Sequence, residues 1–307
     1  MDINFFKTTK ILDGGMGQEL LARGLKAKGT LWSSSALINN NYHQIVIDTH
    51  LDYINAGADI ITTNSFSSRR ERLIENNCPE KFDYANKMAG ELAVKAKKIS
   101  NKNILIAGSL PAQKGTYVVD DRNDEIIEKD FNDQAQLLEP FVDFFYLDVI
   151  SSSKEIKIAD NILKKFNKPI LIGLHISKNG RLPSNETIFK TVQENQNKRW
   201  LGVVMACVSP EIIQNSIDEM KILNIPFGFK ANLWKMDPIP ADEIQKKNKS
   251  YSVEEGANPN TVLGKRDDYT PKIFHDFSNK MKNKGATILG GCCETNPSHI
   301  KEIACLK

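Results

Sequence analysis

Short apolar runs alternate with amphipathic segments along nearly the whole chain. Runs rich in aliphatic, β-branched and aromatic residues predict strands at residues 10–13, 59–64, 103–109, 143–149, 169–175, 201–207, 226–232 and 286–291. Most of these runs are continuously apolar, which is typical of strands buried on both faces of a parallel sheet. A sheet of this kind has to be covered by helices.

The segments between the runs carry helical patterns. Ile47, Leu51 and Ile54, for example, recur at the spacing of one helix face. Helix N-caps followed by proline are predicted at Ser209, Thr270 and Asn296. A strand followed by a helix, about eight times in one domain, is the pattern of an α/β protein with a (β/α)8 TIM barrel. A doubly wound open sheet is the second choice, because it has the same alternation with fewer strands.

One segment interrupts the alternation. Residues 235–269, after the seventh predicted strand, are rich in proline, asparagine, aspartate and lysine. We interpret them as a long insertion within a single barrel domain that spans residues 1–307. The sequence leaves open whether this insertion is a lid, an interface or a passive loop.

Composition excludes several classes of protein. With 40% hydrophobic and 26% charged residues, the chain has the make-up of a globular protein. Its 41 basic and 38 acidic residues are too evenly balanced for a nucleic-acid or membrane-surface partner. No apolar stretch approaches the roughly 20 residues of a transmembrane helix, and the first residues lack an export-signal pattern. A cytoplasmic location is therefore expected.

The cysteines are unevenly distributed. Their number, five, is odd, and without an export signal we expect them to be reduced thiols. Cys207 ends the sixth predicted strand and Cys292 and Cys293 follow the eighth, whereas Cys78 and Cys305 lie elsewhere. Because a barrel keeps its functional residues at the carboxyl ends of its strands, the first three thiols are expected at one rim.

Three thiols at one rim suggest a metal site. As thiolates they could hold Zn²⁺ and leave its fourth tetrahedral position for a substrate. Gly290 and Gly291 are expected to let the backbone turn so that Cys292 and Cys293 point at one ion. Two other interpretations stay open. In the first, the cysteines only pack as small apolar residues, as buried cysteines often do, and an adjacent pair is indeed not a standard ligand spacing. In the second, Cys292 and Cys293 form a redox disulfide without a metal, which ring strain disfavours.

Four sequence segments carry a family resemblance. They are LDGGMGQEL at 12–20, HLDYINAGADIITTNSF at 50–66, MACVSP at 205–210 and GGCCETNPSHI at 290–300. Together, and in this order, they resemble the homocysteine S-methyltransferase family, and the GGCC segment with its tail is highly specific. The resemblance covers nearly the whole chain. It implies a zinc-dependent barrel enzyme that moves a methyl group from a sulfonium or ammonium donor to the thiol of homocysteine, which gives methionine.

The resemblance also implies roles for individual residues. Cys207, Cys292 and Cys293 would be the zinc ligands at the catalytic centre. Asp13 and Gly14 match positions that help to hold the amino-acid end of homocysteine. The other candidate substrate-binding residues are Asn64, which matches a pocket asparagine, Asp148 at the end of the fourth predicted strand, and the aromatic residues Trp32, Phe66 and Tyr117. Aromatic faces suit a methylated cation, although plain packing explains such residues equally well.

The chain departs from the family pattern around the expected substrate pocket. Asp148 stands where the family usually has the longer glutamate, Val149 replaces a following threonine or aromatic residue, and Ala206 replaces asparagine before Cys207. The seventh strand continues as KANLWKM at 230–236, where residues similar to PNSGE are common. Because the change at Val149 weakens a betaine-type aromatic cage, a sulfonium donor is favoured.

Other functions stay open at this stage. The barrel could bind methylated sulfonium or amino-acid ligands around a purely structural zinc ion, or it could methylate a different thiol. The expected partners are homocysteine and a small methyl donor, with no nucleic acid and no membrane. The sequence does not decide whether the chain forms a homo-oligomer.

Overall fold

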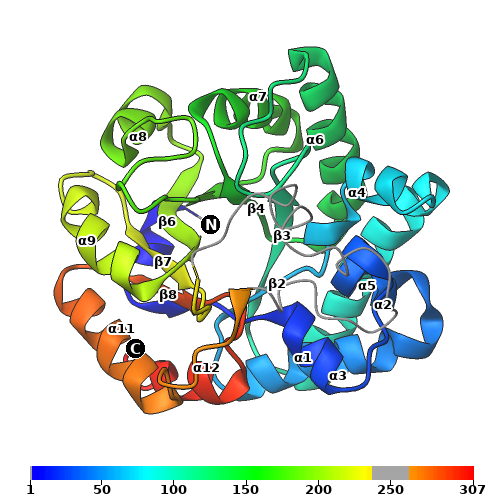
Figure 1. Ribbon diagram of the computed structural model, residues 1–307, viewed down its shortest axis with the longest axis horizontal. Coiled ribbons are helices and arrows are strands. Elements are labelled where there is room, and N and C mark those ends of the chain that lie inside the picture. The colour runs from blue at the N-terminus through cyan, green and yellow to red at the C-terminus, as the bar shows by residue number, and fades with distance from the viewer. Residues whose placement is uncertain (1, 237–262) are drawn as a thin grey trace.

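Parallel strands form a ring at the centre of the molecule, and helices surround it (Figure 1). This computed structural model describes residues 2–236 and 263–307. The eight strands pair in the order β1-β8-β7-β6-β5-β4-β3-β2. A single parallel bridge between Leu12 and Ile60 joins the two ends of this sheet. The ring is therefore nearly closed, so the predicted TIM barrel is confirmed and the open-sheet alternative is wrong.

Each strand overlaps one of the predicted apolar runs. The strands are β1 (Lys10–Ile11), β2 (Ile60–Thr62), β3 (Leu105–Pro111), β4 (Phe144–Ile150), β5 (Ile170–Leu174), β6 (Trp200–Val208), β7 (Phe227–Ala231) and β8 (Ile288–Gly291). Every residue of β4 and β6 is buried, as continuously apolar strands require. β1 is shorter than predicted, since beyond Ile11 only the Leu12 bridge continues its pairing.

Helices cover the outside of the ring. The longer ones are α3 (His43–Asn55), α5 (Phe82–Ser100), α6 (Asp124–Leu138), α7 (Ser153–Leu163), α8 (Ile188–Asn195), α9 (Pro210–Met220), α11 (Pro271–Asn283) and α12 (Pro297–Ala304), and α1 (Met16–Ala22), α2 (Ser35–Ile38) and α4 (Arg70–Glu75) are short. The side chains of Ser209, Thr270 and Asn296 each accept a hydrogen bond from a backbone N–H of the first turn, which confirms the three predicted caps. None of the helices in the described ranges has the length and apolar character needed to cross a membrane.

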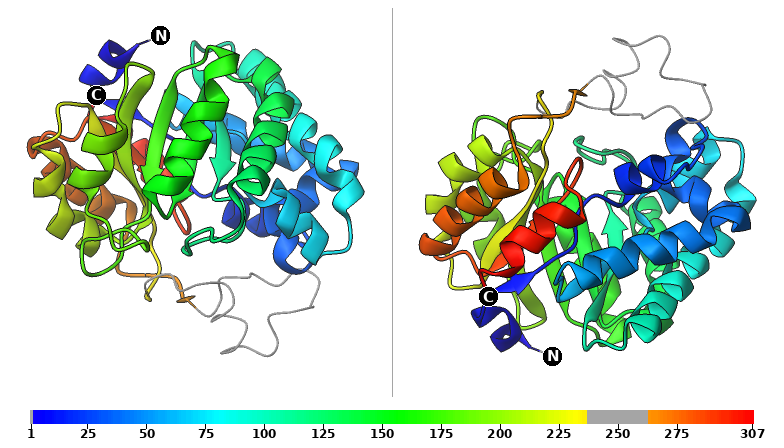
Figure 2. Two further views of the ribbon diagram at one scale, coloured as in Figure 1. Left: turned by 90° about the horizontal axis from the view of Figure 1, so that it is seen from above. Right: turned by 90° about the horizontal axis from the view of Figure 1, so that it is seen from below.

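The amino-terminal end of the barrel is closed by the first 3₁₀ helix, η1 (Ile3–Lys7). Its Phe6 is fully buried and packs edge-on against Phe144 of β4, with ring centroids 6.4 Å apart. Both chain termini lie at this end of the molecule (Figure 2). A substrate site inside the barrel must therefore open at the other end, where the strands have their carboxyl termini.

The expected insertion after β7 is described only at its two ends, since residues 237–262 lie outside the described residues. Trp234 and Lys265 form an antiparallel bridge, and the backbone N–H of Met236 donates to the carbonyl of Leu263 at 3.0 Å. The chain on either side of this segment is therefore held together beside β7. The insertion itself stays a prediction.

Candidate metal and substrate site

A cavity of about 150 Å³ lies at the carboxyl ends of the strands. The structure brings all the residues expected at the site into its lining: Asp13, Gly14, Trp32, Asn64, Phe66, Tyr117, Asp148, Cys207, Cys292 and Cys293. Ser109, Arg72 and Lys230 line it as well, and the sequence analysis did not assign any of these three a role there. The cavity therefore collects side chains from positions far apart in the sequence.

The three rim cysteines form one cluster. The sulfur of Cys293 lies 3.8 Å from that of Cys207 and 4.0 Å from that of Cys292. All three sulfur atoms lie within 4.8 Å of one another, close enough to hold one metal ion. Cys78 and Cys305 are not part of the cluster. The sequence-based separation of the five thiols into a group of three and two outliers therefore matches the structure.

Cys207 occupies an irregular position in β6. The pairing of β6 with β7 shifts register between Ala206 and Val208, and Cys207 adopts a left-handed backbone with φ of 54°. Such a conformation costs about 1–2 kcal/mol in a residue other than glycine. The side chain of Asn232 donates to the carbonyl of Cys207 at 2.8 Å and so supports the bulge. Bulges of this kind often redirect a side chain at a functional site.

Cys292 and Cys293 extend the pairing of β8 with β7. The backbone N–H of Cys292 donates to Ala231 at 2.7 Å, and that of Leu233 donates to Cys293 at 3.0 Å. Gly290 and Gly291, which precede them, do not make the expected sharp turn, because both belong to β8 and neither has a positive φ.

Close packing explains these two glycines instead. A Cβ atom on Gly291 would lie 2.1 Å from the hydroxyl oxygen of Thr295, and one on Gly290 would lie 2.6 Å from the Cβ atom of Leu12. The backbone reverses three residues later, at Glu294, whose φ is 64°. The sequence therefore located the motif correctly but gave the wrong reason for its glycines.

The thiols of the cluster influence one another's ionisation. Burial opposes the charged form of Cys207, but contacts with the other two thiols and with Tyr117 hold its pKa well below the ordinary value. The same contacts with Cys207 raise the pKa values of Cys292 and Cys293 above the ordinary range. Without a cation, the cluster can therefore carry only part of its full negative charge.

Tyr117 contacts the cluster from the segment that follows β3. Its hydroxyl oxygen lies 3.3 Å from the sulfur of Cys207. Its ring packs against His175 with centroids 4.5 Å apart, and edge-on against Trp234 at 6.4 Å. Buried and near the thiols, Tyr117 has a pKa well above its ordinary value, so its hydroxyl stays protonated and can donate to a thiolate.

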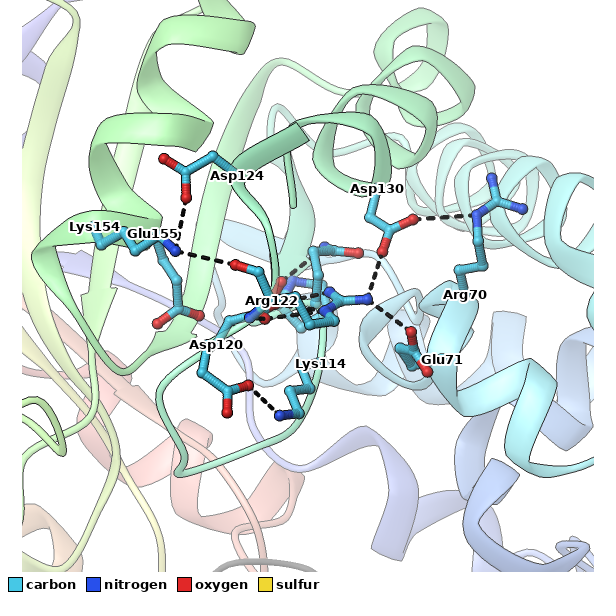
Figure 3. A network of polar contacts seen from close by, with 12 residues as sticks. Arg70, Glu71, Lys114, Asp120, Arg122, Asp124, Asp130, Lys154 and Glu155 are labelled. Carbon is cyan, nitrogen blue, oxygen red and sulfur yellow. Dashed lines mark hydrogen bonds and ion pairs between the residues drawn. The ribbon is translucent and has the colours of Figure 1, made fainter. Parts of the chain in front are cut away.

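A network of ion pairs holds the segment that carries Tyr117 (Figure 3). Arg122 donates to both carboxylate oxygens of the buried Asp120 and also pairs with Asp130 of α6 at 3.0 Å. A further pair, at 2.7 Å, joins Arg122 to Glu71 of α4. The amino group of Lys154 on α7 donates to the carbonyl of Arg122 at 3.1 Å. The segment after β3 is therefore tied to three helices.

Asp13 is engaged by other protein groups inside the barrel. One carboxylate oxygen accepts from the amino group of Lys230 at 2.9 Å and from the hydroxyl of Thr62 at 3.0 Å, and the other accepts from the backbone N–H of Thr62 at 2.6 Å. Burial opposes the charge of Lys230, but the carboxylates of Asp13 and Asp148 hold its pKa above the ordinary value. The sequence analysis placed the segment KANLWKM, which begins at Lys230, near the substrate pocket but gave Lys230 no role, although a lone lysine within the apolar strand PFGFKAN was a signal.

Among the described residues, the hydroxyl groups of Ser109 and Tyr146 lie beside the carboxyl group of Asp148. The hydroxyl of Ser109 donates to the Oδ2 atom of Asp148 at 2.9 Å. Burial raises the pKa of Asp148 to about 7, against the opposing charge of Lys230. The carboxyl group is therefore poised between its neutral and charged forms near neutral pH.

Asn64 and Trp32 belong to one local arrangement at the edge of the cavity. The side-chain amide of Asn64 donates to the carbonyl of Ser33 at 3.1 Å, next to Trp32, whose φ is 45°. The indole of Trp32 lies so close to Gly17 that a Cβ atom there would be 2.3 Å from Nε1. At Gly14 a Cβ atom would come within 2.9 Å of Thr295 and Tyr53. Side chains at these two glycines would therefore disturb the cavity wall.

The sequence profile described as homocysteine S-methyltransferase matches residues 10–306. The chain belongs to the homocysteine S-methyltransferase family. This confirms the resemblance found in the sequence, and it makes the protein a methyltransferase enzyme. Family membership also supports homocysteine as the methyl acceptor.

Individual relatives are distant but full-length. Homocysteine S-methyltransferase 1 of Arabidopsis thaliana is 24% identical over 326 residues, covering 96% of this chain and 92% of the relative. Homocysteine S-methyltransferase YbgG of Bacillus subtilis is 24% identical over 321 residues, covering 96% and 93%. The metallated form of the homocysteine methyltransferase MmuM from Escherichia coli has the same fold, with a TM-score of 0.75, 18% identity and coverage of 97% and 96%.

Proposed function

We propose that this member of the homocysteine S-methyltransferase family holds a zinc ion on Cys207, Cys292 and Cys293 and methylates homocysteine from a sulfonium donor. The observation that supports the proposal most directly is the three-thiol cluster in the wall of the cavity. A cytoplasmic location is part of the proposal, because reduced thiols persist there.

The cluster fits a zinc ion in size and chemistry. Tetrahedral Zn–S bonds of about 2.3 Å place neighbouring sulfur atoms about 3.8 Å apart. The two measured separations are 3.8 and 4.0 Å. Three neighbouring thiols do not all ionise unaided, and a bound cation would allow all three to be thiolates. When bound, zinc would keep the acceptor thiol deprotonated, whereas a free thiol has a pKa of about 8.5.

Asp148 is the carboxylate best placed to bind the ammonium group of homocysteine. Asp13 already accepts three hydrogen bonds from Lys230 and Thr62 and is paired with the Lys230 cation, whereas Asp148 contacts only neutral hydroxyl groups, those of Ser109 and Tyr146, among the described residues. We assign Asp13 a supporting role, in which it holds Lys230 in the cavity wall. Gly14 would keep the wall open beside the substrate, since a Cβ atom there meets Tyr53 and Thr295.

The aromatic lining suits the methyl donor. Trp32, Phe66 and Tyr117 border the same cavity as the thiols. Their ring faces attract a methylated cation without fixing it by a full counter-charge. This matters because the onium centre loses its charge in the transition state, so tight binding of that charge would slow the reaction. The residues contribute by aligning the donor methyl group with the acceptor sulfur.

The proposal is tested by measuring methionine formation by mass spectrometry on reduced, zinc-loaded protein. Homocysteine would be paired in turn with S-methylmethionine, S-adenosylmethionine, dimethylsulfoniopropionate, glycine betaine and methyltetrahydrofolate. We expect turnover with one of the three sulfonium donors. Turnover only with betaine or the folate would overturn the donor assignment. Homocysteine binding without turnover from any donor would favour the ligand-binding alternative.

A further inference from the structure

One positive charge in the cavity wall is only weakly balanced by the protein. Arg72 of α4 lines the cavity, and its Nη1 atom donates to the carbonyl of Thr30 at 3.0 Å. The Nε atom of Arg72 is buried and has no hydrogen-bond partner among the described residues. Glu75 lies 3.6 Å from this atom, which is too far for a hydrogen bond, and its side chain is 52% exposed, so solvent screens the pair. Arg72 can therefore offer its charge and a hydrogen-bond donor to a ligand.

A second guanidinium group lies behind the same part of the wall. Arg69 is 1% exposed and forms no ion pair within the part of the chain that the structure describes. Its Nη1 and Nη2 atoms both donate to the hydroxyl oxygen of Thr116, at 3.1 and 3.2 Å, and it lies over the ring of Phe66. Burial and the nearby charge of Arg72 lower the pKa of Arg69 to about 9. Because buried charges without a counter-charge are unfavourable, this part of the cavity favours an anionic ligand group.

The neighbours of Arg72 indicate which ligand would carry that group. Thr30, to which Arg72 donates, lies on the 3₁₀ helix η2 (Gly29–Ser34), which also carries Trp32. The guanidinium groups are therefore associated with the aromatic residues that are assigned to the methyl donor. Homocysteine is assigned to other groups, since its sulfur would lie at the thiol cluster and its ammonium group at Asp148. The anionic group is therefore expected on the donor.

Resting on the proposed function, we propose that Arg72 determines donor specificity by binding a carboxylate group of the sulfonium donor. The planar N–H groups of a guanidinium match the two oxygen atoms of a carboxylate. In methyl transfer the acceptor thiolate forms the new bond to the methyl group, and the donor sulfur keeps the electron pair of the broken bond and becomes a neutral thioether. The donor carboxylate keeps its charge throughout. Binding through the carboxylate therefore holds the donor without stabilising the sulfonium charge that the reaction removes.

The first test compares two donors on the unmodified enzyme. The sulfonium donor that gives the fastest methionine formation is set against its carboxamide, in which only the carboxylate is replaced. We expect kcat/KM to be about 10- to 100-fold lower for the carboxamide, as is usual for the loss of a hydrogen bond between charged groups. Equal values for the two donors overturn the inference and leave the proposed function intact. Failure of every donor to give methionine overturns both.

A second test removes the cation. Arg72→Met should raise KM for the carboxylate donor about 10- to 100-fold and leave kcat nearly unchanged, because the bound donor and the transition state lose the same interaction. KM for homocysteine should not change. The carboxamide should react as it does with the wild-type enzyme, so that the preference for the carboxylate disappears. A preserved preference in Arg72→Met, or a rise in KM for homocysteine instead of the donor, contradicts the inference.

Two further variants control for effects on folding. Arg72→Lys keeps the charge but not the planar fork, so it should lose part of the preference even if Arg72→Met does not fold. Arg70→Met is the matched control, since Arg70 belongs to the same helix, pairs with Asp130 and Asp133, and is absent from the described lining of the cavity. Its preference should equal that of the wild type. Equal losses of preference in Arg72→Lys and Arg70→Met would show that α4 acts through its fold and not through Arg72.

Discussion

Lys230 of β7 and Asp13, which follows β1, form a buried ion pair across β8, with Nζ and Oδ1 2.9 Å apart. Thr62 of β2 hydrogen-bonds to both partners. The contacts of Thr62 with Asp13 join the two edge strands of the sheet, β1 and β2, where the barrel closes, and Lys230 extends this network to β7 in the cavity wall. The stability contribution of the ion pair should depend on both partners being present.

Removing one partner of this pair should be costly. Lys230→Met leaves the Asp13 carboxylate buried without its cation, and we expect a loss of about 3–5 kcal/mol in the free energy of unfolding. Asp13→Asn with Lys230→Met should lose far less, because apolar or neutral replacements of a whole pair are often tolerated. Urea unfolding of the single and double variants measures this. Equal losses in the two proteins would show that the charge of Asp13 is not the cause.

The metal site gives a prediction with internal controls. Cys207→Ser, Cys292→Ser and Cys293→Ser should each strongly weaken zinc binding and abolish methyl transfer, since serine is a poor zinc ligand. Cys78→Ser and Cys305→Ser should keep both properties, because these thiols lie outside the cluster. Metal content by mass spectrometry and methionine formation are the two readouts. Full activity in any of the first three variants would refute that residue as a ligand.

Asp148 should make stability depend on pH. Its pKa of about 7 in the folded protein exceeds the ordinary 3.8, mainly through burial, so folding favours its protonated form. The groups around it are Ser109 of β3, Tyr146 of β4, Lys230 and the thiol of Cys292. Its contribution is therefore fully present below about pH 4 and is lost as the pH rises to about 7.

The measurement compares wild type with Asp148→Asn. Relative to wild type, the variant should gain about 4 kcal/mol in the free energy of unfolding between pH 4 and 7. Glu155→Gln is the matched control, because burial also raises the pKa of Glu155 to about 7. The carboxylate of Glu155 accepts a hydrogen bond from the hydroxyl of Ser152 and does not line the cavity. Both variants should flatten the stability profile, but only Asp148→Asn should weaken homocysteine binding. A pH-independent difference between wild type and Asp148→Asn would contradict the shift.

Periodicity in the sequence was enough to predict the barrel and the rim on which the thiols meet. Strand position fixes which end of a parallel barrel a residue reaches, so Cys207, Cys292 and Cys293 could be grouped before any coordinates existed. The pairing of Lys230 could not be predicted in this way, because strand order does not say which inward side chains touch. The bulge at Cys207 was equally hidden, since it depends on a bond from Asn232 that forms only in the folded chain.

Tyr117 should strengthen the metal site through its contact with Cys207. Tyr117→Phe removes the hydroxyl 3.3 Å from the sulfur and leaves the ring packing in place. Hydrogen bonds to metal ligands are commonly worth 10-fold or more in metal affinity, so we expect zinc to bind roughly 10-fold more weakly. Competition with a chromophoric chelator measures this. Tyr84→Phe, at an exposed position of α5, should leave the affinity unchanged; a loss common to both variants would mean that the contact is not responsible.

The ion-pair network of Arg122 should control the position of Tyr117. Arg122→Met leaves Asp120, whose side chain is 1% exposed, without its cation, while Asp130 keeps its pair with Arg70 at 3.2 Å. Breaking a buried pair in this way should lower the free energy of unfolding by about 3 kcal/mol. It should also release the segment after β3, since Arg122 connects this segment to Glu71 of α4 and Asp130 of α6.

Urea unfolding and limited proteolysis separate these two effects of Arg122→Met. We expect new cleavage between residues 112 and 123, together with weaker zinc binding similar to that of Tyr117→Phe. Lys129→Met provides the control, because the 65% exposed side chain of Lys129 forms a surface pair with Asp133 on α6, and exposed pairs contribute only about 0–1 kcal/mol. If Arg122→Met loses stability but keeps its protease resistance and zinc affinity, the network supports the fold without positioning Tyr117.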